Sequence, residues 1–98
     1  MSIIHASCVS VNNKAILLLG DSGSGKSDLA LRMIDSGALL VADDYVEIKT
    51  DKNRLIASPP KRLEGLIEAR GVGILTLPFI RDIEVKLAVN LVAHEKID

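Results

Sequence analysis

The sequence predicts a small α/β domain in which a mixed β-sheet carries one strand–loop–helix unit. Residues 15–19 form an uninterrupted apolar run, which is typical of a short strand buried on both faces. Residues 29–34 place apolar side chains at helical spacing. A glycine-rich segment, residues 20–27, separates the two. Several other short apolar or alternating segments supply the rest of the sheet, and no linker or repeat divides the 98 residues.

The elements around the glycine-rich segment follow from local patterns. Residues 3–11 alternate between apolar and polar side chains and predict one strand, and residues 12–14, Asn-Asn-Lys, predict a tight turn into the next. In the helix, Asp28 and Arg32 are four apart with the acid first, a pairing that favours helix formation. Gly37 stands where a left-handed C-terminal cap is expected.

The second half of the chain predicts mostly strands. They are expected at residues 39–42, 45–50, 55–58, 72–77 and 83–92. Residues 51–54, Asp-Lys-Asn-Arg, predict a hairpin turn, and the prolines at 59–60 end the strand that follows it. Leu63, Leu66 and Ile67 have the spacing of a turn or two of helix.

The glycine-rich segment fits the phosphate-binding pattern G-x-x-x-x-G-K-[ST]. Backbone N–H groups of such a P-loop point at a polyphosphate, the lysine adds positive charge, and the final hydroxyl is placed to coordinate Mg²⁺. The helix that follows directs its free N–H groups to the same place. The alternative is a glycine-rich turn between a strand and a helix, and the pattern of the flanking segments favours phosphate binding over it. We expect nucleotide binding by Gly20, Asp21, Ser22, Gly23, Ser24, Gly25, Lys26 and Ser27.

Two acids, Asp43 and Asp44, end the apolar strand at residues 39–42. Four apolar residues followed by an acid make the Walker B pattern, in which a carboxylate serves the Mg²⁺ site from a neighbouring strand. Neighbouring residues on a pleated strand face opposite ways, so one acid could serve the metal while the other accepts a proton. An acidic strand-to-turn boundary is the alternative.

Weaker signals lie on either side of these motifs. Residues 68–73, Glu-Ala-Arg-Gly-Val-Gly, combine an acid, a base and two glycines, which suggests a tight backbone path close to a ligand or another chain. His5, in a half-polar strand, would by itself be a structural histidine. His94 and Glu95 have no predicted role.

Composition excludes several classes of function. A net charge of −1, one Tyr, one Phe and no Trp give no basis for nucleic-acid binding. No apolar stretch approaches the ~20 residues of a membrane helix, and the N-terminus lacks the pattern of a signal peptide. Cys8 is the single cysteine and has no partner for an internal disulfide, so we predict that it is a buried structural thiol. We expect a cytoplasmic protein.

These segments together resemble the HPr kinase/phosphorylase family over residues 4–92. The resemblance is carried by His5, by residues 20–27, 40–44 and 46–48, and by residues 66–74, which hold the family's acid-x-Arg-Gly-x-Gly-Ile signature. It implies a phosphoenolpyruvate carboxykinase-like P-loop fold for one domain at residues 1–98. It also implies ATP or pyrophosphate with Mg²⁺ as cofactors, HPr as the protein partner, and a homo-oligomer, the family form being a hexamer.

The resemblance further implies a reversible serine kinase that regulates carbohydrate metabolism through the phosphotransferase system. Such enzymes phosphorylate a seryl residue of HPr and remove the phosphate by phosphorolysis, releasing pyrophosphate. Carried over by position, Lys26 holds the phosphates, Ser27 and Glu68 form the Mg²⁺ pair, and Asp43 is the base. His5 would lie beside Asp43 and tune it. Two further residues, Asp44 and Arg70, complete the expected catalytic set.

The chain departs from this family at both ends. It begins almost directly with the kinase-like region, as short α-proteobacterial forms do, and it stops before the family's catalytic arginine, phosphorolysis loop and C-terminal helices. We therefore expect that the C-terminal part of the domain is missing. Two other functions stay open: a small-molecule P-loop kinase or carboxykinase-like enzyme, and a non-catalytic nucleotide-binding sensor. The acceptor, its pathway and the preferred donor are also open.

Overall fold

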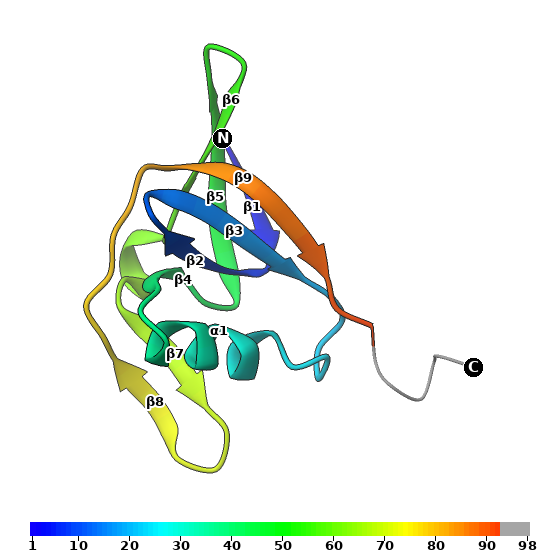
Figure 1. Ribbon diagram of the computed structural model, residues 1–98, viewed down its shortest axis with the longest axis vertical. Helices are drawn as coiled ribbons and strands as arrows, with labels where there is room; N and C mark the ends of the chain where they lie inside the picture. The colour runs from blue at the N-terminus through cyan, green and yellow to red at the C-terminus, as the bar shows by residue number, and fades with distance from the viewer. Residues whose placement is uncertain (93–98) are drawn as a thin grey trace.

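Nine strands, one α-helix and one 3₁₀ turn make up residues 1–92, the part of the chain that this computed structural model describes (Figure 1). The strands are β1 (Ser2–His5), β2 (Ser7–Val11), β3 (Lys14–Leu19), β4 (Leu39–Ala42), β5 (Tyr45–Asp51), β6 (Arg54–Ser58), β7 (Leu66–Ala69), β8 (Gly73–Thr76) and β9 (Ile83–Asn90). The helix α1 (Lys26–Asp35) follows β3, and the turn η1 (Lys61–Leu63) precedes β7. His94 and Glu95 lie outside the described residues.

Seven strands form one mixed sheet in the order β1-β5-β6-β9-β3-β2-β4. The pair β3–β9 is parallel, and the other neighbours in this sheet are antiparallel. The two edge strands are continuous in the chain with inner strands, because β1 leads into β2 and β4 leads into β5. The sheet therefore curls on itself, and β7 and β8 form a separate two-stranded ribbon. The expected small α/β domain with a mixed sheet is confirmed at this level.

The single strand predicted for residues 3–11 is wrong in one respect, because it is broken at Ala6. Residues before the break pair with β5, and residues after it pair with β3 and β4. Facing the break, Asp44 has a φ of 71°, and the Ala6 amide donates to its carbonyl at 3.1 Å. The curl of the sheet requires this bend. The alternation of apolar and polar residues continues through Ala6, so the sequence pattern does not reveal the bend.

Two apolar clusters fill the two sides of the curled sheet. Inside the curl lie Ala6, Cys8, Ala15, Leu17, Val41, Ala42, Val46 and Ala57. Between the sheet and α1 lie Val9, Leu18, Ala30, Ala38, Leu40 and Ile67. Adjacent residues such as Leu17 and Leu18 fall in different clusters. This confirms the strand buried on both faces that the apolar run predicted.

Helix α1 lies across β2, β3 and β4, with β7 beside it (Figure 1). It ends as predicted at Gly37, whose φ is 114°. The Gly37 amide donates to the Ile34 carbonyl and the Ala38 amide to the Met33 carbonyl, both at 3.0 Å. This pair of bonds is the Schellman motif, which favours a residue without a Cβ at the left-handed position. No helix within residues 1–92 is long and apolar enough to cross a membrane.

Both predicted hairpin turns are confirmed. Asn12 and Asn13 have φ values of 52° and 62° between β2 and β3, and Lys52 and Asn53 have values of 49° and 68° between β5 and β6. Two successive positive φ values are the mark of a type I′ turn, whose twist matches that of the flanking strands.

The short helix expected around residues 63–67 is wrong. η1 occupies Lys61–Leu63, and Leu66 and Ile67 belong to β7, which pairs with β8. In β7, Ile67 and Ala69 are buried while Glu68 is exposed, so the period is two rather than 3.6. The three apolar positions fit either period over so short a segment, and only the pairing with β8 decides between them.

Candidate functional site

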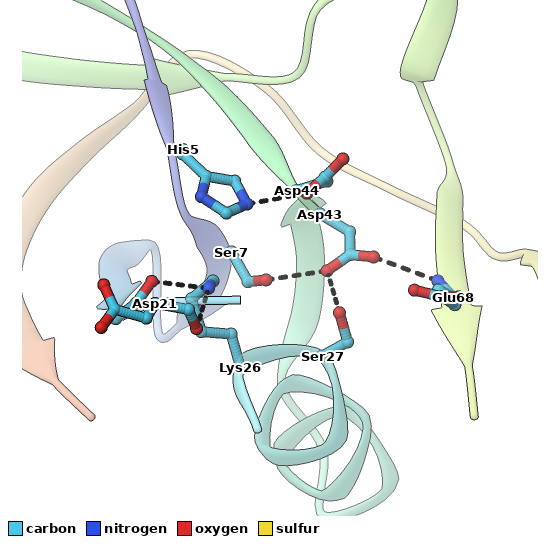
Figure 2. Close-up of polar contacts among 9 residues, drawn as sticks. His5, Ser7, Asp21, Lys26, Ser27, Asp43, Asp44 and Glu68 are labelled. Carbon is cyan, nitrogen blue, oxygen red and sulfur yellow. Dashed lines mark hydrogen bonds and ion pairs between the residues drawn. The ribbon is translucent and has the colours of Figure 1, made fainter. Parts of the chain in front are cut away.

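A pocket of about 350 Å³ lies where the loop between β3 and α1 meets the junctions β1–β2 and β4–β5 and the end of β7. Apart from two glycines, its lining residues have polar or charged side chains. The lining consists of His5, Ser7, Ser22, Gly23, Gly25, Lys26, Ser27, Asp28, Asp44, Glu68 and Arg70. Nine of these are predicted site residues, and they come from four separate segments of the chain. The fold therefore brings the expected site together, as Figure 2 shows for its central residues.

The glycine-rich loop (residues 20–25) leaves the end of β3 and enters α1 through Gly25, whose φ is 96°. Among the glycines of this loop, Gly20 has the least room for a side chain. A Cβ there would lie 2.6 Å from the Ser24 Oγ and 2.8 Å from the Leu91 carbonyl, and its φ is 148°. Among residues 1–92 the buried Ser24 hydroxyl has no hydrogen-bond partner. A buried hydroxyl of this kind is costly unless water or a ligand satisfies it.

Lys26 is held inside its own loop. The residue is only 7% exposed, and its Nζ donates to the Gly20 carbonyl at 2.7 Å and to the Asp21 carbonyl at 3.1 Å (Figure 2). An ammonium group has three donors, so these bonds account for two of them. They fix a buried positive charge at the start of α1, where the N-terminal N–H groups of the helix add to the positive potential.

Asp43 lies behind the pocket and is 7% exposed. Its Oδ1 accepts the Ser7 and Ser27 hydroxyls, each at 2.7 Å, and its Oδ2 accepts the Glu68 amide at 3.0 Å (Figure 2). Three donors from β2, α1 and β7 thus converge on one buried carboxylate. Hydrogen bonds of this kind to an ionised acceptor are about twice as strong as those between neutral groups.

His5 pairs with Asp44 rather than with Asp43, which corrects the expected arrangement. The His5 Nε2 lies 2.9 Å from the Asp44 Oδ1, and both side chains are open to the pocket mouth. The positive φ of Asp44 interrupts the pleat, so the two acids do not simply alternate along an extended strand. Asp43 turns inward to Ser27, and Asp44 turns outward to His5.

Glu68 and Arg70 are both exposed and line the pocket from the end of β7. Their placement depends on the ribbon β7–β8. In this ribbon the alternation of buried Ile67 and Ala69 leaves Glu68 facing away from the core. The signature segment thus reaches the glycine-rich loop as expected.

Sequence reasoning missed three residues of this site. Ser7 lines the pocket and binds Asp43, and Asp28 lines the pocket from the first turn of α1. Tyr45 packs its ring against His5, with ring centres 5.5 Å apart. A signal for Ser7 existed in the sequence, because it comes two residues after His5 in the segment predicted as one strand, and side chains two apart on a strand share a face. The other two depend on contacts that local patterns do not predict.

Comparison with known proteins gives the family. A family model described as the HPr Serine kinase C-terminal domain matches residues 1–96. Among solved structures, the Hpr(Ser) kinase/phosphatase from Coxiella burnetii is similar, at 33% sequence identity and a TM-score of 0.89. The match covers 100% of this chain and 64% of that one, so the chain spans less than two-thirds of the relative's length. The chain belongs to the HPr serine kinase C-terminal domain family.

Proposed function

We propose that this domain binds Mg²⁺–ATP at residues 20–27 and transfers the terminal phosphoryl group to a seryl hydroxyl of the phosphocarrier HPr. The observation that carries the proposal is the contact of Ser27 with Asp43 at the start of α1, beside a buried Lys26. Phosphoryl transfer mainly needs positioning and neutralisation of charge, and this arrangement can supply both. Membership of the family supports a kinase-type reaction and HPr as the partner.

The residues present fit a Mg²⁺ ion. The Ser27 hydroxyl donates a hydrogen bond to Asp43, which leaves the lone pairs of the Ser27 oxygen for a cation. Glu68 adds a carboxylate at the same pocket. Within residues 1–92 no three His, Cys, Asp or Glu side chains cluster as a protein-only metal cage. Mg²⁺ commonly takes one or two protein ligands, with phosphates and waters supplying the rest. When bound, the ion neutralises phosphate charge.

The glycine-rich loop would hold the phosphates of ATP or of pyrophosphate. Lys26 has one donor left for a phosphate oxygen, and the first turn of α1 presents free N–H groups. The unpartnered Ser24 hydroxyl in the same loop is another donor that a ligand or water could satisfy. An anion here would therefore meet donors that otherwise lack partners.

Asp44 is better placed than Asp43 to accept the seryl proton. Asp43 is buried and its two oxygens already receive three hydrogen bonds. Asp44 is exposed at the pocket, and its carboxylate contacts the His5 ring. In the forward direction Asp44 takes the proton as the seryl oxygen bonds to the γ-phosphorus and the bond to ADP breaks. His5 orients the carboxylate, and Asp43 supports Ser27.

The same groups can run the reverse reaction. An oxygen of inorganic phosphate attacks phosphoserine, the seryl oxygen leaves with the proton returned by Asp44, and pyrophosphate is the second product. Arg70, exposed at the pocket, would add positive charge for the second phosphate. Assembly into a homo-oligomer is also proposed, from family membership.

The test uses the purified chain, an HPr protein, ATP and Mg²⁺. Transfer predicts phosphoserine on HPr by mass spectrometry, and added inorganic phosphate should remove it with release of pyrophosphate. ATP binding without any phosphoserine would instead favour a nucleotide sensor. Phosphorylation of a metabolite in the absence of HPr would favour a small-molecule kinase. EDTA in place of Mg²⁺ is the matched control and should abolish transfer.

A further inference from the structure

One buried hydroxyl at the site has no role in the proposed phosphoryl transfer. Ser7, on β2, is 0% exposed overall, yet its side chain borders the pocket and donates to the Asp43 Oδ1 at 2.7 Å. We infer that Ser7 is a positioning residue that holds the Asp43 carboxylate so that the Ser27 oxygen faces the cation site. This inference deepens the proposed function and rests on it.

The geometry around Asp43 supports this role. The Oδ1 atom is shared by the hydroxyls of Ser7 and Ser27, while Oδ2 is held by the Glu68 amide. The three donors come from a strand of the main sheet, from the helix and from the separate ribbon β7–β8. Rotation of the carboxylate in either direction would break at least one bond. Its orientation is therefore set by all three donors together.

Ser7 differs from the other two donor residues because it is not a proposed ligand of the cation. Ser27 and Glu68 are the proposed ligands of the cation, so both contact an ion that binds and dissociates. Ser7 belongs to β2, which pairs with β3 on one side and β4 on the other. Its hydroxyl is thus carried by an inner strand of the main sheet. Groups that hydrogen-bond a metal ligand directly commonly affect metal affinity by about 10–100-fold. Asp43 is such a group for Ser27, and Ser7 acts through Asp43.

A purely structural role for Ser7 makes a different prediction. If the hydroxyl only satisfied a buried polar group, its removal would lower stability and would not distinguish Mg²⁺–ATP from metal-free ATP. The chain offers a matched control in Ser10, which is on the same strand and 3% exposed, with a hydroxyl that has no partner in the described part of the chain. Ser10→Ala removes a buried serine hydroxyl from β2 without touching Asp43.

The experiment measures ATP binding by calorimetry with Mg²⁺ and, separately, with EDTA. The proteins are the wild type, Ser7→Ala, Ser7→Thr and Ser10→Ala, with thermal unfolding recorded for each. We expect Ser7→Ala to lose about tenfold of the Mg²⁺-dependent gain in affinity, the low end of the effect of a direct partner of a metal ligand, with metal-free binding unchanged. Ser7→Thr, which keeps the hydroxyl, and Ser10→Ala should both keep the gain. Ser7→Cys, with a weak donor of similar size, replaces Ser7→Ala if that variant does not fold.

Two results would overturn the inference alone. One is an unchanged Mg²⁺-dependent gain in Ser7→Ala or Ser7→Cys, and the other is an equal loss of Mg²⁺–ATP and metal-free ATP binding. A wild type without any Mg²⁺-dependent gain would overturn the proposed function, and this inference with it. The wild-type measurement thus separates the two failures.

Discussion

His5 and Asp44 are 39 residues apart in the chain, yet the His5 Nε2 lies 2.9 Å from the Asp44 Oδ1. The pairing of β1 with β5 causes this, since His5 is directly opposite Tyr45, the residue after Asp44. The positive φ of Asp44 then turns its side chain toward the pocket. The bend that lets the sheet curl is also what separates the two adjacent acids, one facing the core and one facing solvent.

Asp44→Asn should therefore lose phosphoryl transfer while it keeps nucleotide binding. An amide cannot accept the seryl proton, and loss of a positioned base commonly costs about 10²–10⁴-fold in rate. The Asn side chain is nearly the same size and the position is exposed, so folding and ATP affinity should be unaffected. Initial rates of HPr phosphorylation and calorimetric ATP binding measure the two effects.

Asp43→Asn is the matched comparison for Asp44→Asn. Its carboxylate accepts three hydrogen bonds in a buried position, so the change should lower stability and weaken Mg²⁺-dependent ATP binding. The opposite pattern, in which Asp43→Asn binds Mg²⁺–ATP normally but transfers nothing and Asp44→Asn stays active, would restore Asp43 as the base.

Lys26→Ala should weaken ATP binding about tenfold or more, because a hydrogen bond to a charged group is commonly worth about 1.5–3 kcal/mol. Lys26 also ties two carbonyls of its loop, so the variant should expose this loop to faster amide hydrogen exchange. Lys49→Ala is the control, since it removes the same charge from an exposed position on β5. Equal ATP affinity in the two variants would argue against phosphate binding by this loop.

Features set by neighbouring residues could be predicted from the sequence. The buried strand before Gly20, the helix that ends at Gly37 and both hairpin turns depend on patterns within a few residues. The motif residues 20–27 likewise share one local structure. His5 and Glu68 were placed at the site by resemblance alone, and the pocket brings them to the same lining.

Features set by pairing between distant segments could not be predicted. The break at Ala6 exists because two halves of an alternating segment pair with different strands. Leu66 and Ile67 became strand rather than helix because β8 is available to pair with β7. The partner of His5 depends on the φ of Asp44, which no residue pattern indicated.

Gly20→Ala should lower the free energy of unfolding by about 2 kcal/mol more than Gly37→Ala does. Both glycines have a positive φ, so both variants are strained in the backbone. At Gly20 a Cβ would also lie 2.8 Å from the Leu91 carbonyl oxygen, whereas at Gly37 a Cβ would meet no atom of residues 1–92 within 4 Å beyond its chain neighbours. Urea unfolding of the two variants measures the difference, and equal destabilisation would show that the loop can move to make room.

The Cys8 thiol should make stability depend on pH above 9. Burial raises its pKa from the ordinary 9.0 to about 12. Below the pKa of the thiol in the unfolded chain, the thiol is neutral in both states and the protein keeps its full free energy of unfolding. As the pH rises from that pKa toward the pKa of the folded state, the unfolded chain loses the proton first, and the free energy of unfolding falls. The free energy of unfolding should thus fall by about 1.4 kcal/mol per pH unit from this group between pH 9 and 12. Urea unfolding at pH 8, 9.5 and 10.5 should show a shallower slope for Cys8→Ala, and parallel slopes would mean that the thiol is not kept neutral by burial.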